Sequence, residues 1–305
     1  MTSPTAPRPG PHGGDGTRLA AALGVPVDDI LDLSASLNPA APDVAALVAG
    51  QLGAIARYPD ARAATAALAS AIGVDPGRLV VTNGGAEAIA LVADHLGSGW
   101  VEEPEFSLYR RHLRTLDPAA GRWRSNPGNP SGVLAPPDDT AAVWDEAFWP
   151  LATGTWTRGD ADRGAWVVGS LTKLWACPGL RIGYAIAPDG ASAATLRRRQ
   201  PRWSVNSIAC AVVERLLADT DLPGWRDAIA RLRVELADVL SAAGFAVDAA
   251  DAPWVLVPHA GDLRERLATL GILVRDCASF DLPGTVRIAV PDEVGLDRFR
   301  RAVTL

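Results

Sequence analysis

The chain has 305 residues, 48% of them hydrophobic, which is enough for one large α/β unit or for a large and a small domain. Its net charge of −6 and pI near 5.3 leave no basic footprint, so nucleic acid and anionic membrane surfaces are not expected as partners. No stretch reaches the roughly 18 uninterrupted apolar residues that a membrane-spanning helix requires.

The N-terminal segment and the cysteines bear on the compartment. Residues 1–16 hold four prolines and four glycines without an apolar core, which predicts neither a signal peptide nor a membrane anchor. The three cysteines are widely spaced and form no CxxC pair, and the four histidines lack metal-ligand spacing. We therefore predict a cytoplasmic protein without disulfides or a metal site.

Short apolar strands that end in polar loops dominate the first two thirds of the chain. The pattern predicts helices at 17–23, 43–50, 61–72, from the turn at 83–87 to about 96, and after 106 through 115, with strands at 30–33, 79–82, 99–103, 122–125, 165–169 and 182–187 and a further strand ending at Asp145. This alternation is typical of an α/β fold with a largely parallel sheet, whose ligand-binding groups lie at the carboxyl ends of the strands.

The pattern changes after residue 190 to longer amphipathic helices, expected at 191–199, 204–219 and 222–243. Strands follow at 253–257, 272–276 and 285–290, with helices between and after them. We predict a large domain at 34–190 and a smaller α+β domain formed by 1–33 and 191–305. The sequence has no internal repeat and no long linker between them.

Lys173 is the central candidate residue. The sequence contains 29 lysines and arginines, and Lys173 is the only lysine. Arginine cannot replace an amine that must lose its proton and attack a carbonyl, because its guanidinium stays charged. A surface lysine retained by chance is the ordinary alternative. The preceding apolar run at 167–169 predicts a buried strand end, which favours a nucleophile that forms a Schiff base.

A phosphate site is predicted around this amine. The strand at 79–82 leads through a glycine turn into a helix, and such a helix start directs backbone N–H groups toward an anion. A Gly-Gly turn alone is usually only a turn, but hydroxyls and an arginine follow in the lysine segment. The candidate phosphate ligands are Gly84, Gly85, Ala86, Ser170, Thr172 and Arg181. The turn is not a dinucleotide fingerprint, because the third glycine is absent.

Three further residues match what a phosphorylated pyridine aldehyde needs from a protein. Asp145 at a strand end can keep the ring nitrogen protonated, Phe106 can stack on the ring, and Asn129 can donate to the phenolate oxygen. Each has a simpler alternative: Asp145 as a helix N-cap, Phe106 as core, and Asn129 as a turn residue. The functional interpretation is favoured because all these roles fall at strand ends of one predicted sheet.

The motifs together resemble fold-type-I pyridoxal-phosphate enzymes of the class I/II aminotransferase group, in order over nearly the whole chain. They are Tyr58-Pro59-Asp60, 83–87, 126–132, 145–148, 170–173 and 181–184. Within that group, His12-Gly13-Gly14-Asp15, residues 31–39 and Val274-Arg275-Asp276-Cys277 are most similar to the threonine-phosphate decarboxylase family of cobalamin biosynthesis. The histidinol-phosphate aminotransferases are its nearest neighbours.

The resemblance implies a pyridoxal 5'-phosphate cofactor and a homodimer in which Tyr58 reaches the partner subunit's cofactor phosphate. It also implies that Arg287 binds the substrate carboxylate and that His12, Asn38 and Arg275 surround the substrate's anionic groups. Two arginines suit a substrate with both a carboxylate and a phosphate, because guanidinium matches either oxyanion. A surface charge is the alternative for Arg287, and its apolar neighbours in the sequence disfavour it.

The sequence departs from the family pattern in three places. Between Glu103 and Asn126 there is room for one helix and one strand, where the family has an additional helix and strand. Position 148 is Phe, which leaves Asn129 as the only predicted donor to the phenolate. Cys177-Pro178 interrupts the loop between the lysine and Arg181.

The leading hypothesis is pyridoxal-phosphate-dependent decarboxylation of L-threonine O-3-phosphate or a related phosphorylated amino acid. The alternatives are an aminotransferase of the histidinol-phosphate type, a specialised-metabolism enzyme on the same scaffold, and a non-catalytic sensor or assembly protein. The residues leave open which bond at the α-carbon is broken, because that depends on how the substrate carboxylate is held.

Overall fold

The computed structural model describes residues 7–10 and 12–304, so the expectation for residues 1–16 falls partly outside the described chain. Two compact units are present: unit 1 comprises 1–40, 130–133 and 227–305, and unit 2 comprises 41–129 and 134–226. The boundaries predicted from the sequence lie at 33/34 and 190/191. Residues 191–226 belong to unit 2 because their helices pack on elements of that unit.

Unit 2 contains a seven-stranded sheet. Its order is β2 (Leu79–Thr82), β8 (Gly183–Ile186), β7 (Trp166–Ser170), β6 (Val143–Asp145), β5 (Arg122–Ser125), β3 (Ser98–Val101) and β4 (Thr115–Leu116). β8 is antiparallel to both of its neighbours and the other pairs are parallel. The predicted α/β class with a mostly parallel sheet is therefore confirmed.

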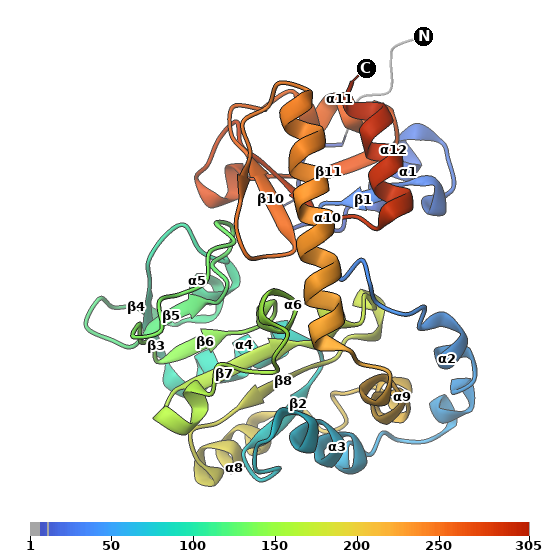
Figure 1. Ribbon diagram of the computed structural model, residues 1–305. Helices are drawn as coiled ribbons and strands as arrows, with labels where there is room; N and C mark the ends of the chain where they lie inside the picture. Colours follow the sequence, from blue (N-terminus) through green and yellow to red (C-terminus); the bar gives the residue numbers. More distant parts are fainter. Residues whose placement is uncertain (1–6, 11, 305) are drawn as a thin grey trace. The chain divides into compact units, whose positions relative to one another are not determined.

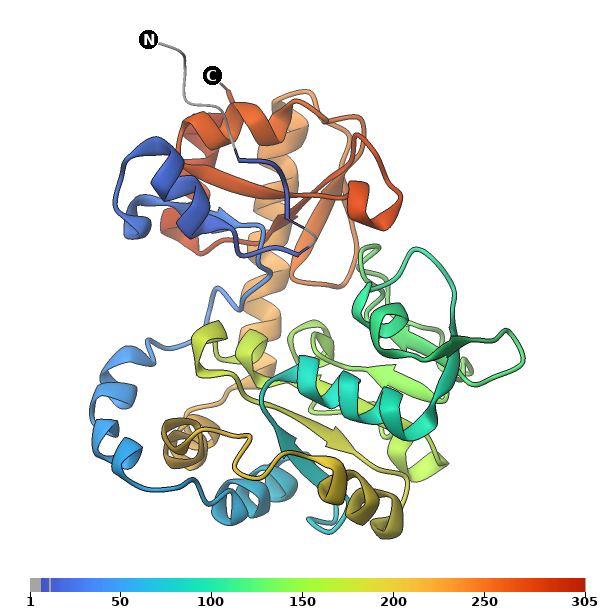
Figure 2. The ribbon, with the colours of Figure 1, turned by 180° about the vertical axis from the view of Figure 1, so that it is seen from behind.

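Unit 2 also contains eight α-helices within the described residues. They are α2 (Ala45–Ala49), α3 (Arg62–Ile72), α4 (Gly85–Leu96), α5 (Leu108–His112), α6 (Trp149–Thr153), α7 (Leu171–Leu174), α8 (Gly190–Arg199) and α9 (Ser207–Ala218). α4 lies across β7 and β8, in front of the sheet in Figure 2, and buries Ile89 and Val92 against Trp123 and Val168. α9 packs against α3, and α8 packs against α4 and β2.

The segment after residue 106 differs from the prediction of a helix through Thr115. α5 ends at His112, Leu113 is extended, and the N–H groups of Arg114 and Thr115 both donate to the carbonyl of Gly97. Thr115 and Leu116 thereby form β4 at the edge of the sheet beside β3. A local pattern could not predict this change, because the edge of β3 offers the backbone a partner 17 or more residues away in sequence.

Unit 1 contains a five-stranded sheet in the order β1 (Leu31–Leu33), β11 (Ile272–Asp276), β12 (Val286–Ala289), β10 (Trp254–Val257) and β9 (Asp248–Ala249). Its helices are α1 (Gly16–Leu23), α11 (Leu263–Thr269), α12 (Glu293–Val303) and most of α10 (Leu222–Ala242). In α10, drawn in orange in Figure 1, Leu232, Leu236 and Leu240 recur every four residues. One face of the helix therefore packs into the core with Phe299 of α12.

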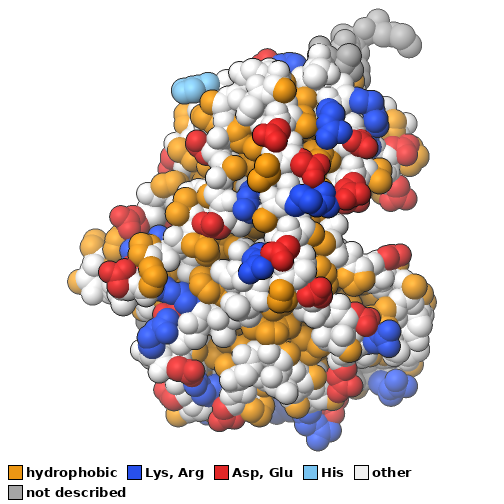
Figure 3. Space-filling view, in the orientation of Figure 1, with side chains coloured by type: hydrophobic (Ala, Val, Ile, Leu, Met, Phe, Trp, Pro, Cys, Tyr) orange, Lys and Arg blue, Asp and Glu red, His pale blue; other side chains and the backbone are white. Residues whose placement is uncertain are grey.

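Short 3₁₀ turns occur at Val27–Asp29, Leu52–Ala56, Asp160–Arg163, Pro178–Leu180 and Ala278–Phe280. None of the helices in the described part of the chain is long and apolar enough to cross a membrane. On the face drawn in Figure 3, acidic and cationic side chains are interspersed. Within residues 7–10 and 12–304, no cluster of three or more His, Cys, Asp or Glu side chains is arranged to hold a metal ion.

Candidate active site

The glycine turn after β2 lies against Arg181. Gly84 has a φ of 79° and precedes the first residue of α4, so its backbone conformation is one that side-chain-bearing residues rarely adopt. A Cβ at Gly84 would clash with the guanidinium of Arg181. Helix α4 has 12 residues, and no side chain caps its N-terminus. The backbone N–H groups of this N-terminus therefore lie close to the guanidinium of Arg181. This is the donor chemistry that a phosphate group requires.

The lysine segment reaches the same edge of the sheet from β7. Ser170 is the last residue of β7 and pairs with Gly183 of β8, which in turn pairs with Thr82 of β2. The hydroxyl oxygens of Ser170 and Thr172 are 2.7 Å apart. Lys173 follows in α7 and is only partly exposed. The segments that carry the lysine, both hydroxyls, the glycine turn and Arg181 therefore lie at one edge of the sheet.

Asp145 is the last residue of β6 and is partly buried. Its Oδ2 accepts a hydrogen bond from the Tyr109 hydroxyl at 2.8 Å, and its Oδ1 accepts one from the N–H of Ala147 at 2.9 Å. Burial raises the pKa of Asp145, while these two hydrogen bonds and the positive charge of Lys173 oppose the rise. The helix-cap alternative does not apply, because α6 begins at Trp149 with Phe148 as its N-cap.

Tyr109 was not predicted from the sequence as a site residue. Its side chain is completely buried, and its ring makes an edge-to-face contact with Phe106, with centroids 5.7 Å apart. Burial raises the pKa of the Tyr109 phenol further above its ordinary value, so the hydroxyl remains a donor to Asp145. A tyrosine one helical turn after an aromatic residue is not in itself a signal of such a role.

The backbone N–H groups of Phe106 and Asn129 donate hydrogen bonds to residues close to Asp145. The N–H of Asn129 donates to the Ser125 hydroxyl at 2.8 Å, and Ser125 is the register partner of Asp145. The N–H of Phe106 donates to Glu105, whose carboxylate also accepts two donors of Ser125. Glu105 is a second residue missed from the sequence, because nothing in the local pattern marks a glutamate before an aromatic residue as buried.

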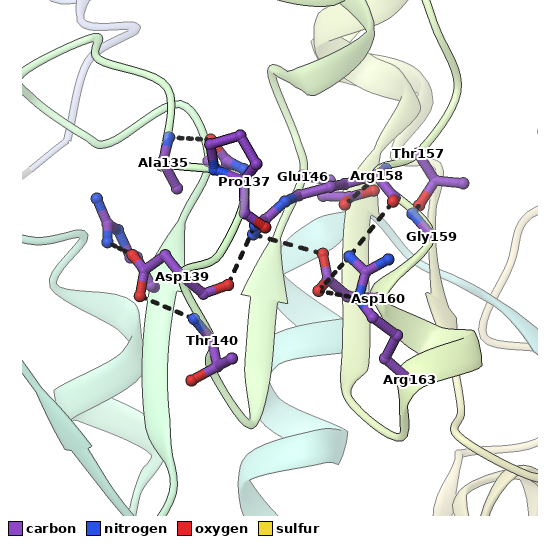
Figure 4. Close-up of polar contacts among 12 residues, drawn as sticks. Ala135, Pro137, Asp139, Thr140, Glu146, Thr157, Arg158, Gly159, Asp160 and Arg163 are labelled. Atoms are coloured by element: carbon purple, nitrogen blue, oxygen red, sulfur yellow. Dashed lines mark hydrogen bonds and ion pairs between the residues drawn. The ribbon is translucent and has the colours of Figure 1, made fainter.

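Glu146, the residue after Asp145, belongs to a separate polar cluster (Figure 4). Its Oε1 accepts the N–H of Arg158 at 3.1 Å, and burial raises the pKa of Glu146 to about 7. The Arg158 guanidinium donates to the carbonyls of Pro136 and Pro137, at 2.8 and 2.7 Å, and lies over the Trp144 ring. This cluster fixes the loop after 135 to the end of β6, and so supports the strand that carries Asp145.

Tyr58 is at the surface of unit 2 with 79% of its side chain exposed. Its ring lies 4.6 Å from that of Trp203, which is itself 57% exposed, and Leu52 and Ile55 nearby in sequence are exposed as well. Among the described residues, no recorded hydrogen bond joins Tyr58 to the predicted phosphate ligands of unit 2. The predicted contact is one with a second subunit.

Unit 1 carries the four residues predicted to bind the substrate, and two of them face each other. Arg275 of β11 and Arg287 of β12 are direct register partners, with 5% and 7% of their surfaces exposed. Both guanidinium carbons lie within 6.0 Å of the Phe280 ring centroid. Burial lowers the pKa of Arg287 to about 10. The alternative of a surface-strand charge is wrong, because Arg287 is buried.

His12 and Arg275 line one small pocket of unit 1, and Arg264 lines it as well. Arg275 donates to the carbonyl of Gly10 at 3.1 Å, and the buried Arg264 donates to that of Pro7 at 2.7 Å, so two arginines hold the segment that carries His12. Arg264 was not singled out from the sequence, where it is one of many arginines. Asn38 is buried, and its Oδ1 accepts the N–H of Ala40 at 3.0 Å.

Pyridoxal phosphate fits the residues of unit 2. Gly84 and Gly183 leave space that a Cβ would fill, because a Cβ there would strike Arg181 or the backbone of the glycine turn. The hydroxyls of Ser170 and Thr172 and the guanidinium of Arg181 belong to the same site. An amine and a partly buried carboxylate lie at the ends of the neighbouring strands β7 and β6. Such a donor set provides for one phosphate, one carbonyl and one protonated ring nitrogen, and it defines a pyridoxal-phosphate-dependent enzyme on a fold-type-I scaffold.

The comparison with protein families agrees with this assignment. Residues 123–303 match the family described as aminotransferase class I and II, and the chain belongs to this family. A solved histidinol-phosphate aminotransferase from Sinorhizobium meliloti, in complex with pyridoxal-5'-phosphate, has the same fold. Its TM-score is 0.82 at 18% identity, and the match covers 98% of this chain and 94% of that one.

Two curated relatives are similar along most of their length. The threonine-phosphate decarboxylase of Salmonella typhimurium is 30% identical, with 96% of each chain covered. Histidinol-phosphate aminotransferase 1 of Dechloromonas aromatica is 26% identical, covering 94% of this chain and 92% of that one. The first alignment extends over 357 positions, so it includes positions at which this 305-residue chain has no residue. The enzyme class is thus decarboxylase or aminotransferase, with pyridoxal phosphate as cofactor.

Proposed function

We propose that the protein decarboxylates L-threonine O-3-phosphate, or a closely related phosphorylated amino acid, to an amino alcohol phosphate used in cobalamin biosynthesis. The observation that supports this most is the pairing of Arg275 with Arg287. Like charges directly opposite each other in a sheet are destabilising, and both groups are buried. An anionic ligand relieves that repulsion.

Threonine phosphate carries two anionic groups on one small molecule. In this proposal Arg287 binds the α-carboxylate, and Arg275 binds the phosphate together with His12 and Asn38. A planar guanidinium makes paired hydrogen bonds to either oxyanion. Histidinol phosphate has a phosphate but no carboxylate, so by itself it offers only one partner to the two arginines.

The residues of unit 2 would hold the cofactor. Gly84, Gly85 and Ala86 would offer backbone N–H groups to its phosphate, with Ser170, Thr172 and Arg181 completing the shell. Asp145 would accept a hydrogen bond from the protonated ring nitrogen, Phe106 would cover one ring face and Asn129 would donate to the phenolate. The Tyr109 hydroxyl, 2.8 Å from Asp145, favours the ionised carboxylate that this role needs.

When bound, pyridoxal phosphate supplies an electron sink for the bond that breaks at the substrate's α-carbon. The residues of the chain would select which α-carbon bond breaks and would transfer the proton. Arg287 fixes the carboxylate and thereby determines which α-carbon bond is aligned for cleavage. The amine of Lys173 would deliver a proton to the α-carbon in place of the departing carbon dioxide.

The proposal includes a homodimer. The exposed pair of Tyr58 and Trp203, with Leu52 and Ile55, forms an apolar surface that a second subunit covers. In that arrangement the Tyr58 hydroxyl reaches the phosphate ligands of the other subunit, as the family resemblance implies. The substrate is then a small molecule, and neither nucleic acid nor a membrane is part of the reaction.

An aminotransferase of the histidinol-phosphate type is the second candidate, supported by the relatives of that name at similar identity. Here Lys173 carries the proton between the α-carbon and the cofactor. The two buried arginines serve this reaction too, because its amino-group donor or acceptor is a dicarboxylic acid. The difference lies in whether carbon dioxide is released and whether a keto acid is required.

Product analysis distinguishes the two reactions. The purified protein with pyridoxal phosphate is incubated with threonine phosphate and, separately, with histidinol phosphate, each with and without 2-oxoglutarate, and the products are identified by mass spectrometry. From threonine phosphate we expect carbon dioxide and aminopropanol phosphate whether or not 2-oxoglutarate is present. Glutamate formed from histidinol phosphate and 2-oxoglutarate, with no carbon dioxide released from threonine phosphate, refutes the decarboxylase and supports the aminotransferase.

A further inference from the structure

Glu105 is a buried carboxylate to which the proposed reaction assigns no role. Only 4% of its surface is exposed. Its Oε1 accepts the N–H of Ser125 at 2.8 Å and the Ser125 hydroxyl at 2.6 Å, and its Oε2 accepts the N–H of Phe106 at 2.8 Å. Burying a charge is unfavourable unless its oxygens are satisfied, and here both are.

Ser125 connects Glu105 to Asn129, the predicted donor to the phenolate oxygen of the cofactor. Its hydroxyl oxygen accepts the N–H of Asn129 at 2.8 Å. Ser125 also stands opposite Asp145 in the pairing of β5 with β6. The Glu105 carboxylate therefore connects, within unit 2, the backbones of the predicted ring-stacking residue Phe106 and the predicted phenolate donor Asn129.

We propose that Glu105 is a positioning residue that, acting through Ser125, holds Phe106 and Asn129 in the orientation required for binding pyridoxal phosphate. This rests on the proposed roles of Phe106 and Asn129. A carboxylate is the side chain suited to the position, because it presents only acceptors to the donors of Ser125 and Phe106. Glutamine has nearly the same shape, but its NH₂ would face one of these backbone N–H groups.

The charge of Glu105 also lies close to other ionisable groups. Asp145 on β6, Tyr109 on α5, Arg124 on β5 and Glu103 at the preceding turn face it. Burial raises the pKa of Glu105 to about 7, and the negative charge of Asp145 contributes to the rise. By reciprocity, an ionised Glu105 favours the protonated form of a titrating group held beside Asp145. The pH at which the bound cofactor titrates should therefore depend on the charge of Glu105.

The test compares Glu105→Gln with Glu102→Gln, a matched control that removes an exposed glutamate three residues away. Pyridoxal phosphate affinity is measured by fluorescence titration, and the pH midpoint of the bound cofactor's absorbance by spectrophotometry. We expect Glu105→Gln to weaken binding about tenfold, which corresponds to about 1.4 kcal/mol, and to move the midpoint to lower pH. Glu102→Gln is expected to bind within about twofold of the wild type, with an unchanged midpoint.

An unchanged affinity and midpoint in folded Glu105→Gln overturn the inference. If that variant does not fold, Ser125→Ala takes its place, because it removes only the hydroxyl that links Glu105 to Asn129. Weaker cofactor binding by Ser125→Ala supports the inference, and wild-type binding refutes it. These measurements use no substrate, so a wild-type protein that binds pyridoxal phosphate but releases no carbon dioxide refutes the proposed function alone.

Discussion

Glu146→Gln tests how the buried carboxyls affect stability. Glu146 is 1% exposed, its Oε1 accepts the N–H of Arg158, and its Oε2 has no hydrogen-bond partner in the described structure. Burial raises its pKa from 4.5 to about 7. Because the pKa is higher in the folded protein than in the unfolded chain, folding strengthens proton binding. The resulting stabilisation is fully present below pH 4.5 and is lost as the pH rises through 7.

The size of the effect follows from linkage. One such carboxyl changes the free energy of unfolding by about 1.4 kcal/mol per pH unit, or roughly 3 kcal/mol over the interval from 4.5 to 7. Glutamine does not titrate, so it removes this part of the pH dependence. Any packing cost of the substitution is the same at every pH. Relative to the wild type, Glu146→Gln should therefore gain roughly 3 kcal/mol between pH 4.5 and 8.

The assay is denaturant unfolding of the cofactor-free protein at pH 5, 6, 7 and 8, followed by the fluorescence of its ten tryptophans. Glu214→Gln, which removes an exposed glutamate on α9, is the control and should follow the wild-type pH dependence. If the curves for Glu146→Gln and the wild type stay parallel from pH 5 to 8, the carboxyl does not titrate in this interval and the reasoning fails.

Three further substitutions test the site. Lys173→Ala should lower kcat at least about 100-fold and give bound pyridoxal phosphate the absorbance of the free aldehyde; retained turnover in rapid kinetics contradicts the role of the amine. Arg287→Met should raise the KM for threonine phosphate about 10- to 100-fold, because it removes a buried charge-assisted contact, with cofactor affinity unchanged; an unaltered KM excludes it as the carboxylate ligand. Tyr109→Phe removes a hydrogen bond to the charged Asp145 and should weaken cofactor binding about tenfold or more in equilibrium titration, and wild-type affinity would be evidence against its support of Asp145.

The sequence by itself determined the parts of this protein that depend on short stretches of chain. Strand ends, glycine turns and helix starts follow from local periodicity and local backbone preference, so β2, β7 and the start of α4 were predicted close to their observed bounds. The lone Lys173 could be recognised because arginine cannot replace an amine nucleophile. The order of motifs along the chain then indicated the family.

The tertiary structure decided which residues meet. Tyr109 and Asp145 are 36 positions apart, and Glu105 and Ser125 are 20 apart, so no local pattern pairs them. The end of α5 at His112 depends on the edge of β3, and the facing of Arg275 and Arg287 depends on strand register. Burial, which raises the pKa values of Glu105 and Glu146, is likewise a property of the packed chain. Hydrogen bonds and desolvation act between groups that are near in space, and only the folded chain fixes that nearness.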